Sequence, residues 1–171
     1  MELRRLLRSR AFFIMLLWLG THSSAQVVAK GGEVIEMHSP MVVNVPFKEI
    51  TFFGKTYWKF PELRKYVCDG VDMESLQVKI GKMPEIESHK LGKLVVDGTL
   101  YVRPSHDRTV DLQFDLLHGE EIIANAFKKG IDAEEGDTIG FSIKIPIKPE
   151  KLQTLISDRS NSSMRITMTV R

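Results

Sequence analysis

The sequence predicts an all-β fold, a single β-sandwich with one or two short helical connections. Apolar and polar residues alternate in several segments, which is typical of strands that bury one face and expose the other. Turn-forming residues separate these segments at intervals that suit a sandwich or a barrel. Only two segments have helical spacing, and both are short.

The first 25 residues are expected to be a cleavable signal peptide. Four arginines precede the apolar run from Ala11 to Leu19, and small residues follow it as far as Ala25. The order basic, apolar, small is that of a secretory signal. The run is shorter than the roughly 20 residues that a transmembrane helix needs. We therefore expect an exported chain, periplasmic or extracellular, that begins at about Gln26 and has no membrane span after cleavage.

Charge excludes one large class of partner. The signal carries four of the 24 basic residues and one of the 22 acidic residues, so 20 basic and 21 acidic residues remain. A nearly neutral chain without clusters of lysine and arginine lacks the positive surface expected of a nucleic-acid-binding protein. The remaining residues 26–171 are enough for one domain with a sizeable core.

Each element of the predicted sandwich has its own signal. The alternating segments are Met41 to Val45, Leu76 to Ile80, Val110 to Leu116, Ile139 to Ile145 and Met164 to Val170. Turns are predicted at Gly54-Lys55, Asp97-Gly98, His118-Gly119 and Gly136-Asp137, and Asp97-Gly98 is the strongest because a type I′ turn favours this pair. Helical turns are predicted at Pro61 to Val67 and Pro149 to Ile156. Residues 26–40 are expected to be either loose or an edge strand.

The pattern from Gly92 to Arg171 resembles an immunoglobulin-like or fibronectin-type sandwich, with Greek-key connections. The Cys and Trp hallmarks of antibody domains are missing. This resemblance concerns the fold and implies no functional residues.

An aromatic hairpin is the most distinctive feature of the sequence. Phe52, Phe53, Tyr57, Trp58 and Phe60 surround the Gly54-Lys55 turn. Neighbouring strand residues point to opposite faces, so the rings cannot all enter one core. We therefore predict that Phe53, Tyr57 and Trp58 form a ligand or partner surface. The alternative is that the segment Pro61 to Val67 covers the outer face and makes a second core.

The sequence favours no cofactor and no metal, although two groups of potential ligands exist. Met37, His38 and Met41 offer soft atoms that suit copper. Asp132, Glu134, Glu135 and Asp137 offer carboxylates around Gly136 that suit calcium, but without EF-hand spacing.

The motifs of common enzymes are missing. The sequence has no G-x-S-x-G, H-E-x-x-H, P-loop or G-x-G-x-x-G motif. The neighbours Ser105, His106 and Asp107 diverge on a turn and do not predict a triad. Cys68, the single cysteine, is expected to be buried rather than reactive. Asn161-Ser162-Ser163 matches the N-glycosylation pattern, which matters only in a eukaryotic host.

These observations favour an exported, non-catalytic binding or interaction module. The aromatic hairpin or an exposed sheet edge would engage a protein or glycan partner. Two alternatives stay open: a structural envelope or extracellular subunit without a small ligand, and an exported protein that binds copper or calcium.

Overall fold

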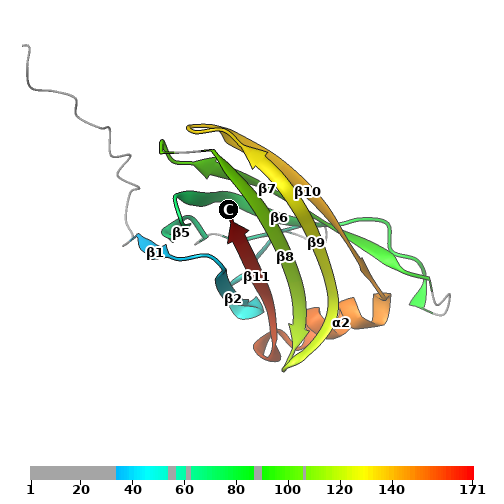
Figure 1. Ribbon diagram of the computed structural model, residues 1–171. Coiled ribbons are helices and arrows are strands. Elements are labelled where there is room, and N and C mark those ends of the chain that lie inside the picture. Colours follow the sequence, from blue (N-terminus) through cyan, green and yellow to red (C-terminus); the bar gives the residue numbers. More distant parts are fainter. Residues whose placement is uncertain (1–33, 54–56, 61–62, 87–89, 106) are drawn as a thin grey trace, which may run out of the picture. The chain divides into compact units, whose positions relative to one another are not determined.

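A computed structural model of the chain describes residues 34–53, 57–60, 63–86, 90–105 and 107–171; the side chains of residues 51–53 and 57 lie outside this description. Two β-sheets pack face to face, and the described residues contain one α-helix (Figure 1). The predicted all-β sandwich is therefore confirmed.

The larger sheet has seven strands and is built around β6. Strand β6 pairs with β7 along one edge and with β5 and β4 along the other, β7 pairs with β10, and β4 pairs with β3. All of these pairs are antiparallel, whereas β1 joins β5 in parallel. The strands are β1 (Ile35–Met37), β3 (Thr51–Phe53), β4 (Tyr57–Lys59), β5 (Tyr66–Cys68), β6 (Val71–Ile80), β7 (Gly92–Val102) and β10 (Thr138–Ile147).

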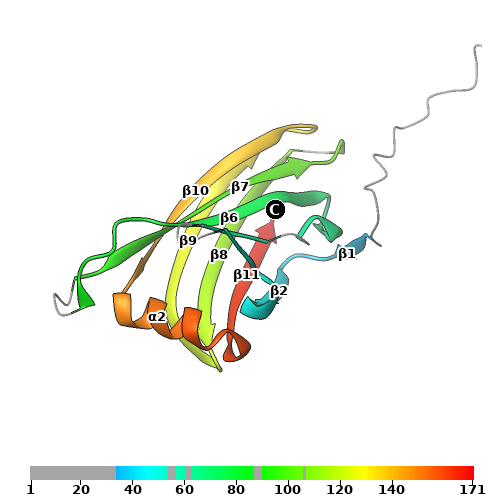
Figure 2. The same ribbon diagram turned by 180° about the vertical axis from the view of Figure 1, so that it is seen from behind.

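The smaller sheet has four antiparallel strands in the order β2, β11, β8 and β9, so β2 and β9 form its edges. These strands are β2 (Met41–Pro46), β8 (Arg108–His118), β9 (Glu121–Ala133) and β11 (Ser162–Val170). The helix α2 (Pro149–Ser157) lies at one end of the sandwich (Figure 2). Single helical turns occur at η1 (Phe47–Glu49), η2 (Leu63–Lys65) and η4 (Arg159–Asn161).

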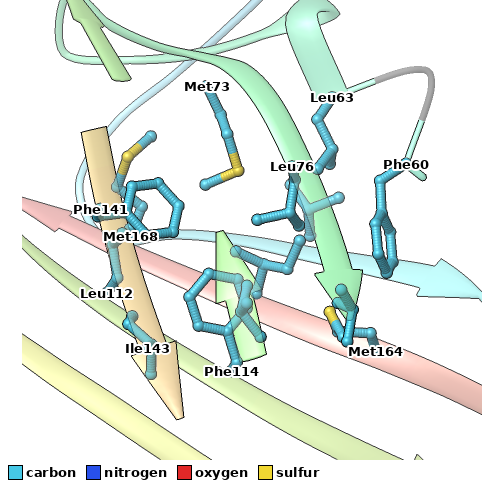
Figure 3. Packing of buried hydrophobic residues seen from close by; sticks show 14 of the residues in the cluster. Phe60, Leu63, Met73, Leu76, Leu112, Phe114, Phe141, Ile143, Met164 and Met168 are labelled. Atoms are coloured by element: carbon cyan, nitrogen blue, oxygen red, sulfur yellow. The ribbon is translucent and has the colours of Figure 1, made fainter. Parts of the chain in front are cut away.

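One apolar core fills the space between the sheets. Phe114 of β8 and Phe141 of β10 face each other across it with ring centroids 6.2 Å apart (Figure 3). Trp58 also belongs to this core, because its side chain is only 1% exposed. Its ring and that of Phe47 pack in an edge-on arrangement, with ring centroids 5.5 Å apart. The inward positions of both sheets follow the period-two pattern of the sequence.

The five alternating segments all lie in strands, and the predicted helix at Pro149 is α2. The turns after His118 and at Gly136 are present, with positive φ at Gly119 and Gly136. The Gly54-Lys55 turn lies outside the described residues. Residues 35–37, within the segment expected to be loose or an edge strand, form β1.

The turn predicted at Asp97-Gly98 is wrong, because both residues lie in the middle of β7. Gly98 is required there by close packing rather than by a turn. A Cβ atom at this position would lie 2.5 Å from the ring of Phe141 and 2.6 Å from the carbonyl oxygen of Ser75. Glycine inside a strand often marks such a close approach.

The helix predicted over Pro61 to Val67 is also wrong in extent. Residues 61–62 lie outside the description, the helical turn covers only Leu63–Lys65, and Tyr66–Cys68 is a strand. Pairing of Val67 and Cys68 with β6 and β1 overrides the local helical tendency.

We expect Trp58→Ala to destabilise the protein by about 3–5 kcal/mol, because it leaves a large cavity in the core. Urea unfolding followed by circular dichroism measures the change. Lys144→Ala, at an exposed position of β10, is the matched control and should change stability by less than about 0.5 kcal/mol. A small effect of Trp58→Ala would contradict the core position of this ring.

Candidate binding cleft between the sheets

A cleft of about 500 Å³ opens where the edge strand β2 faces Phe60, η2 and Tyr66. Its lining combines residues of both sheets: Val43, Asn44, Val45, Glu49, Phe60, Leu63, Lys65 and Tyr66. The volume lies within the range of small-ligand sites.

The floor of the cleft is apolar and its rim is polar. Val43, Phe60 and Leu63 are buried, and Figure 3 shows Phe60 and Leu63 at the two ends of the same connection. Asn44 and Glu49 are exposed, and Lys65 is half-buried with Nζ 5.1 Å from the centre of the Tyr66 ring. Such a lining suits an apolar group that carries a polar end or a polar backbone.

The walls of the cleft are fixed by contacts from distant parts of the chain. The Arg159 guanidinium donates hydrogen bonds to the carbonyl oxygens of Phe47 and Ile50, both at 2.9 Å. These bonds hold η1 and the chain that follows β2. The edge-on contact of Phe47 with Trp58 ties the same segment to β4 of the other sheet.

Between β1 of the larger sheet and β2 of the smaller sheet the chain makes a polar crossing, in which Ser39 and Asp69 are joined by a hydrogen bond. The Ser39 backbone N–H donates to Asp69 Oδ2 at 2.7 Å, and the Val170 N–H donates to Ser39 Oγ at 2.9 Å. Asp69 also contacts His38 Nδ1 at 3.2 Å. The bond from Ser39 and then the contact with His38 lower the pKa of Asp69. This crossing therefore fixes where β2 begins.

The structure corrects one of the three predicted surface residues. Trp58 is buried in the core and is not part of an exposed surface. Phe53 and Tyr57 are direct partners in the β3–β4 pair, but their side chains lie outside the described residues. Sequence reasoning missed the cleft residues of β2, whose alternation was recognised only as a strand signal.

Neither group of potential metal ligands is arranged around one metal position, although Asp132, Glu134 and Asp137 line one open pocket. Met41 is buried in the core, whereas the His38 side chain is fully exposed beside Asp69. Asp132 accepts a hydrogen bond from Thr109 Oγ1 at 3.0 Å. Within the described residues, no three His, Cys, Asp or Glu side chains are arranged to hold a metal ion. Glu134, Glu135 and Asp137 surround the turn between β9 and β10.

Cys68 is fully buried, as predicted, and lies where β5 meets the smaller sheet. Its Sγ donates a weak hydrogen bond to the carbonyl oxygen of Met168 at 3.8 Å. Burial raises the pKa of the thiol, which keeps it protonated.

Serine, histidine and aspartate also meet near the β8–β9 turn. His118 Nδ1 lies 3.4 Å from Ser162 Oγ, and His118 Nε2 lies 3.8 Å from Asp158 Oδ2. Ser162 is only 2% exposed, and its hydroxyl donates to the carbonyl oxygen of Asp158 at 2.7 Å. The contacts join β8 to η4 and do not present an accessible nucleophile.

The comparisons with known proteins leave the function open. No family model matches the chain, and no curated protein matches it. A solved structure described as a protein from Archaeoglobus fulgidus covers 58% of this chain and 83% of its own, with 9% identity and a TM-score of 0.42. A cyclase from Fischerella sp. TAU covers 75% of this chain and 74% of its own, with 13% identity and a TM-score of 0.21. Neither likeness is close enough to indicate a function.

A separate observation concerns membrane association. In the part of the chain that the structure describes, no helix has both the length and the apolar character needed to cross a bilayer.

Asp72, on β6, is an ionisable group at a partly buried position. Arg103 Nε donates to its Oδ2 at 3.3 Å and forms an ion pair with its buried Oδ1 at 3.2 Å, although Oδ1 accepts no hydrogen bond. Burial raises the pKa of Asp72, and this effect outweighs the opposing effect of Arg103. Arg103 also pairs with Glu36 at 2.9 Å, so it keeps an anionic partner without Asp72.

We expect Asp72→Asn to stabilise the protein at pH 7. A carboxyl whose pKa is raised by folding stabilises the native state while it is protonated, and this contribution is lost as the pH rises through the folded pKa. The increase in stability caused by Asp72→Asn should therefore shrink near pH 3, below the ordinary aspartate pKa of about 3.9. Urea midpoints at both pH values measure it.

The matched control is Asp97→Asn, which should have the opposite sign. The hydrogen bond from Lys79 Nζ at 2.9 Å lowers the pKa of Asp97. Its contribution is present above the ordinary pKa and is lost as the pH falls, so Asp97→Asn should destabilise the protein at pH 7. Equal effects of the two substitutions on stability would contradict the opposite directions of the pKa shifts of Asp72 and Asp97.

Proposed function

We propose that this chain is an exported, non-catalytic binding module whose site is the cleft beside β2. The observation that carries the proposal is the position of the cleft, where β2 of the smaller sheet meets Phe60, η2 and β5 beside the core. An apolar floor reaches solvent there through a polar rim.

The fixed walls support binding rather than a packing defect. Arg159 holds η1 with two short hydrogen bonds, and the Ser39–Asp69 crossing holds the start of β2. A site that is already formed loses little conformational entropy when a ligand enters, which favours affinity.

The chemistry of the lining also supports binding rather than catalysis. Glu49 and Lys65 are the charged residues of the cleft, and they stand at its rim beside buried aliphatic and aromatic side chains. This composition recognises apolar surface and one polar end, as expected for a binding site.

The fluorescent probe anilinonaphthalene sulfonate tests the cleft, because its rings match the floor and its sulfonate matches Lys65. We expect a several-fold rise in fluorescence with the folded protein. Val45→Trp should weaken the binding at least about tenfold by filling the cleft. Amide chemical shifts should map the probe to β2 and η2.

The control for this experiment is Val95→Trp. Val95 is half-buried on β7 and does not line the cleft, so this variant should bind the probe as the parent protein does. Equal binding by both tryptophan variants, or no binding by the parent, would contradict a site in the cleft.

Export is tested separately with the full-length chain in a bacterial host. We expect mass spectrometry to find a mature protein outside the cytosol that begins at Gln26. Ala25→Arg should block cleavage, because signal peptidase requires a small residue before the cut. A full-length protein that stays in the cytosol would contradict export and leave the binding proposal to be judged on its own test.

A further inference from the structure

We propose that the partner is an extended segment of another protein, which adds as a strand to the free edge of β2 and places alternate apolar side chains in the cleft. This inference rests on the proposed function and names the class of partner.

The hydrogen-bond register shows which backbone groups of β2 face outward. Thr109 and Arg171 exchange both backbone hydrogen bonds, at 2.9 and 3.0 Å, so the odd-numbered residues of β11 bond to β8. The even-numbered residues of β11 therefore bond towards β2, as the Val170 N–H does to Ser39.

The partners of those even-numbered residues are Met41, Val43 and Val45. Val42 and Asn44 consequently direct their N–H and C=O groups away from β11. Within the described part of the chain, no strand pairs with this edge. Val42 is 49% exposed and Asn44 is exposed, so an incoming strand can reach both residues.

The cleft lies where the side chains of such a strand would point. Residues opposite Val43 and Val45 would share their inward face and lie over the apolar floor at Phe60 and Leu63. The residue between them would face solvent. The site therefore fits a segment with apolar residues at positions i and i+2.

The other edges of the two sheets are protected against strand addition. Strand β9 has exposed Lys128 and Lys129, a positive φ at Gly130 and two irregularities in its pairing with β8. Strand β10 has exposed Lys144 and Pro146, and proline lacks the donor that pairing needs. Strands β1 and β3 have only three residues each. Charges, bulges, prolines and short length are the usual means of protecting an edge.

Strand β2 differs from all of these edges. It has six residues, none of them charged, and its proline stands at the end of the strand. An unprotected edge beside a cleft with an apolar floor offers backbone hydrogen bonds for affinity and a place for side chains that gives specificity. A small apolar molecule would fill the cleft but would leave the backbone groups of the edge unused.

The test uses the mature protein and a displayed library of random peptides of about nine residues. We expect selected peptides to share apolar residues at alternate positions. Hydrogen exchange on binding of a synthetic selected peptide should slow at the amides of Val42 and Asn44. Val43 and Val45 already bond to β11, and their exchange should change little.

Two substitutions at one position separate strand addition from side-chain docking. Asn44→Pro removes an N–H that faces away from β11, so the fold should be kept. Peptide affinity should fall about tenfold with the loss of one backbone hydrogen bond. Asn44→Ala keeps the N–H and removes only the amide group at the rim, so it should lose clearly less affinity than Asn44→Pro, within about threefold of the parent protein. Circular dichroism confirms that both variants are folded.

Each other outcome overturns the inference. Equal affinity of the two Asn44 variants would leave the cleft as a site for side chains or small molecules without an added strand. Failure to select any peptide, while the fluorescent probe still binds, would have the same meaning. A dimer that Asn44→Pro dissociates and Asn44→Ala preserves would place a second copy of this chain on β2. Loss of probe binding to the parent protein would instead reject the proposed function itself.

Discussion

The apolar core shared by the two sheets is the constraint on which the rest of this structure depends. The chain has a single cysteine, so no intrachain disulfide can hold the sheets together. Burial of alternate side chains must supply the stabilisation, and this fixes the inward positions of almost every strand. Gly98 shows how tight the constraint is, because the ring of Phe141 leaves no room for a Cβ atom there. Functional variation is left to the outer faces, the connections and the edges.

Local patterns in the sequence were sufficient to predict the strands that this core requires. Period-two alternation identified β2, β6, β8, β10 and β11, and the N-terminal proline and apolar spacing identified α2. The pattern failed where packing between distant segments decides the outcome. Asp97-Gly98 has the composition of a turn, yet β7 continues through it because Phe141 covers the glycine. Local sequence predicts that Trp58 is a surface ring, whereas in the fold it packs edge-on against Phe47.

The cleft could not be predicted for a similar reason. The alternation of Val43 and Val45 predicts a strand, but its position at the edge of a sheet depends on the order of strands, which local sequence does not encode. The floor also requires Phe60 and Leu63 from the other sheet. The predicted hairpin was nevertheless close to the site, since Phe60 follows β4 directly. Of the predicted aromatic hairpin, Phe60 lines the cleft, whereas Trp58 is part of the core.

An unprotected edge strand can pair with other chains and aggregate. The contacts around β2 restrain the strand at both of its ends. Ser39, bonded to both Asp69 and Val170, fixes the start of the strand, and Arg159 fixes the chain beyond its end. These bonds prevent β2 from shifting in register, which would turn its apolar side chains towards solvent. Strand β9 is longer, and there lysines and bulges serve the protective purpose instead. In the proposed strand addition, the lysines and bulges of β9 protect one edge of the smaller sheet, and the uncharged edge of β2 is left for a single incoming strand.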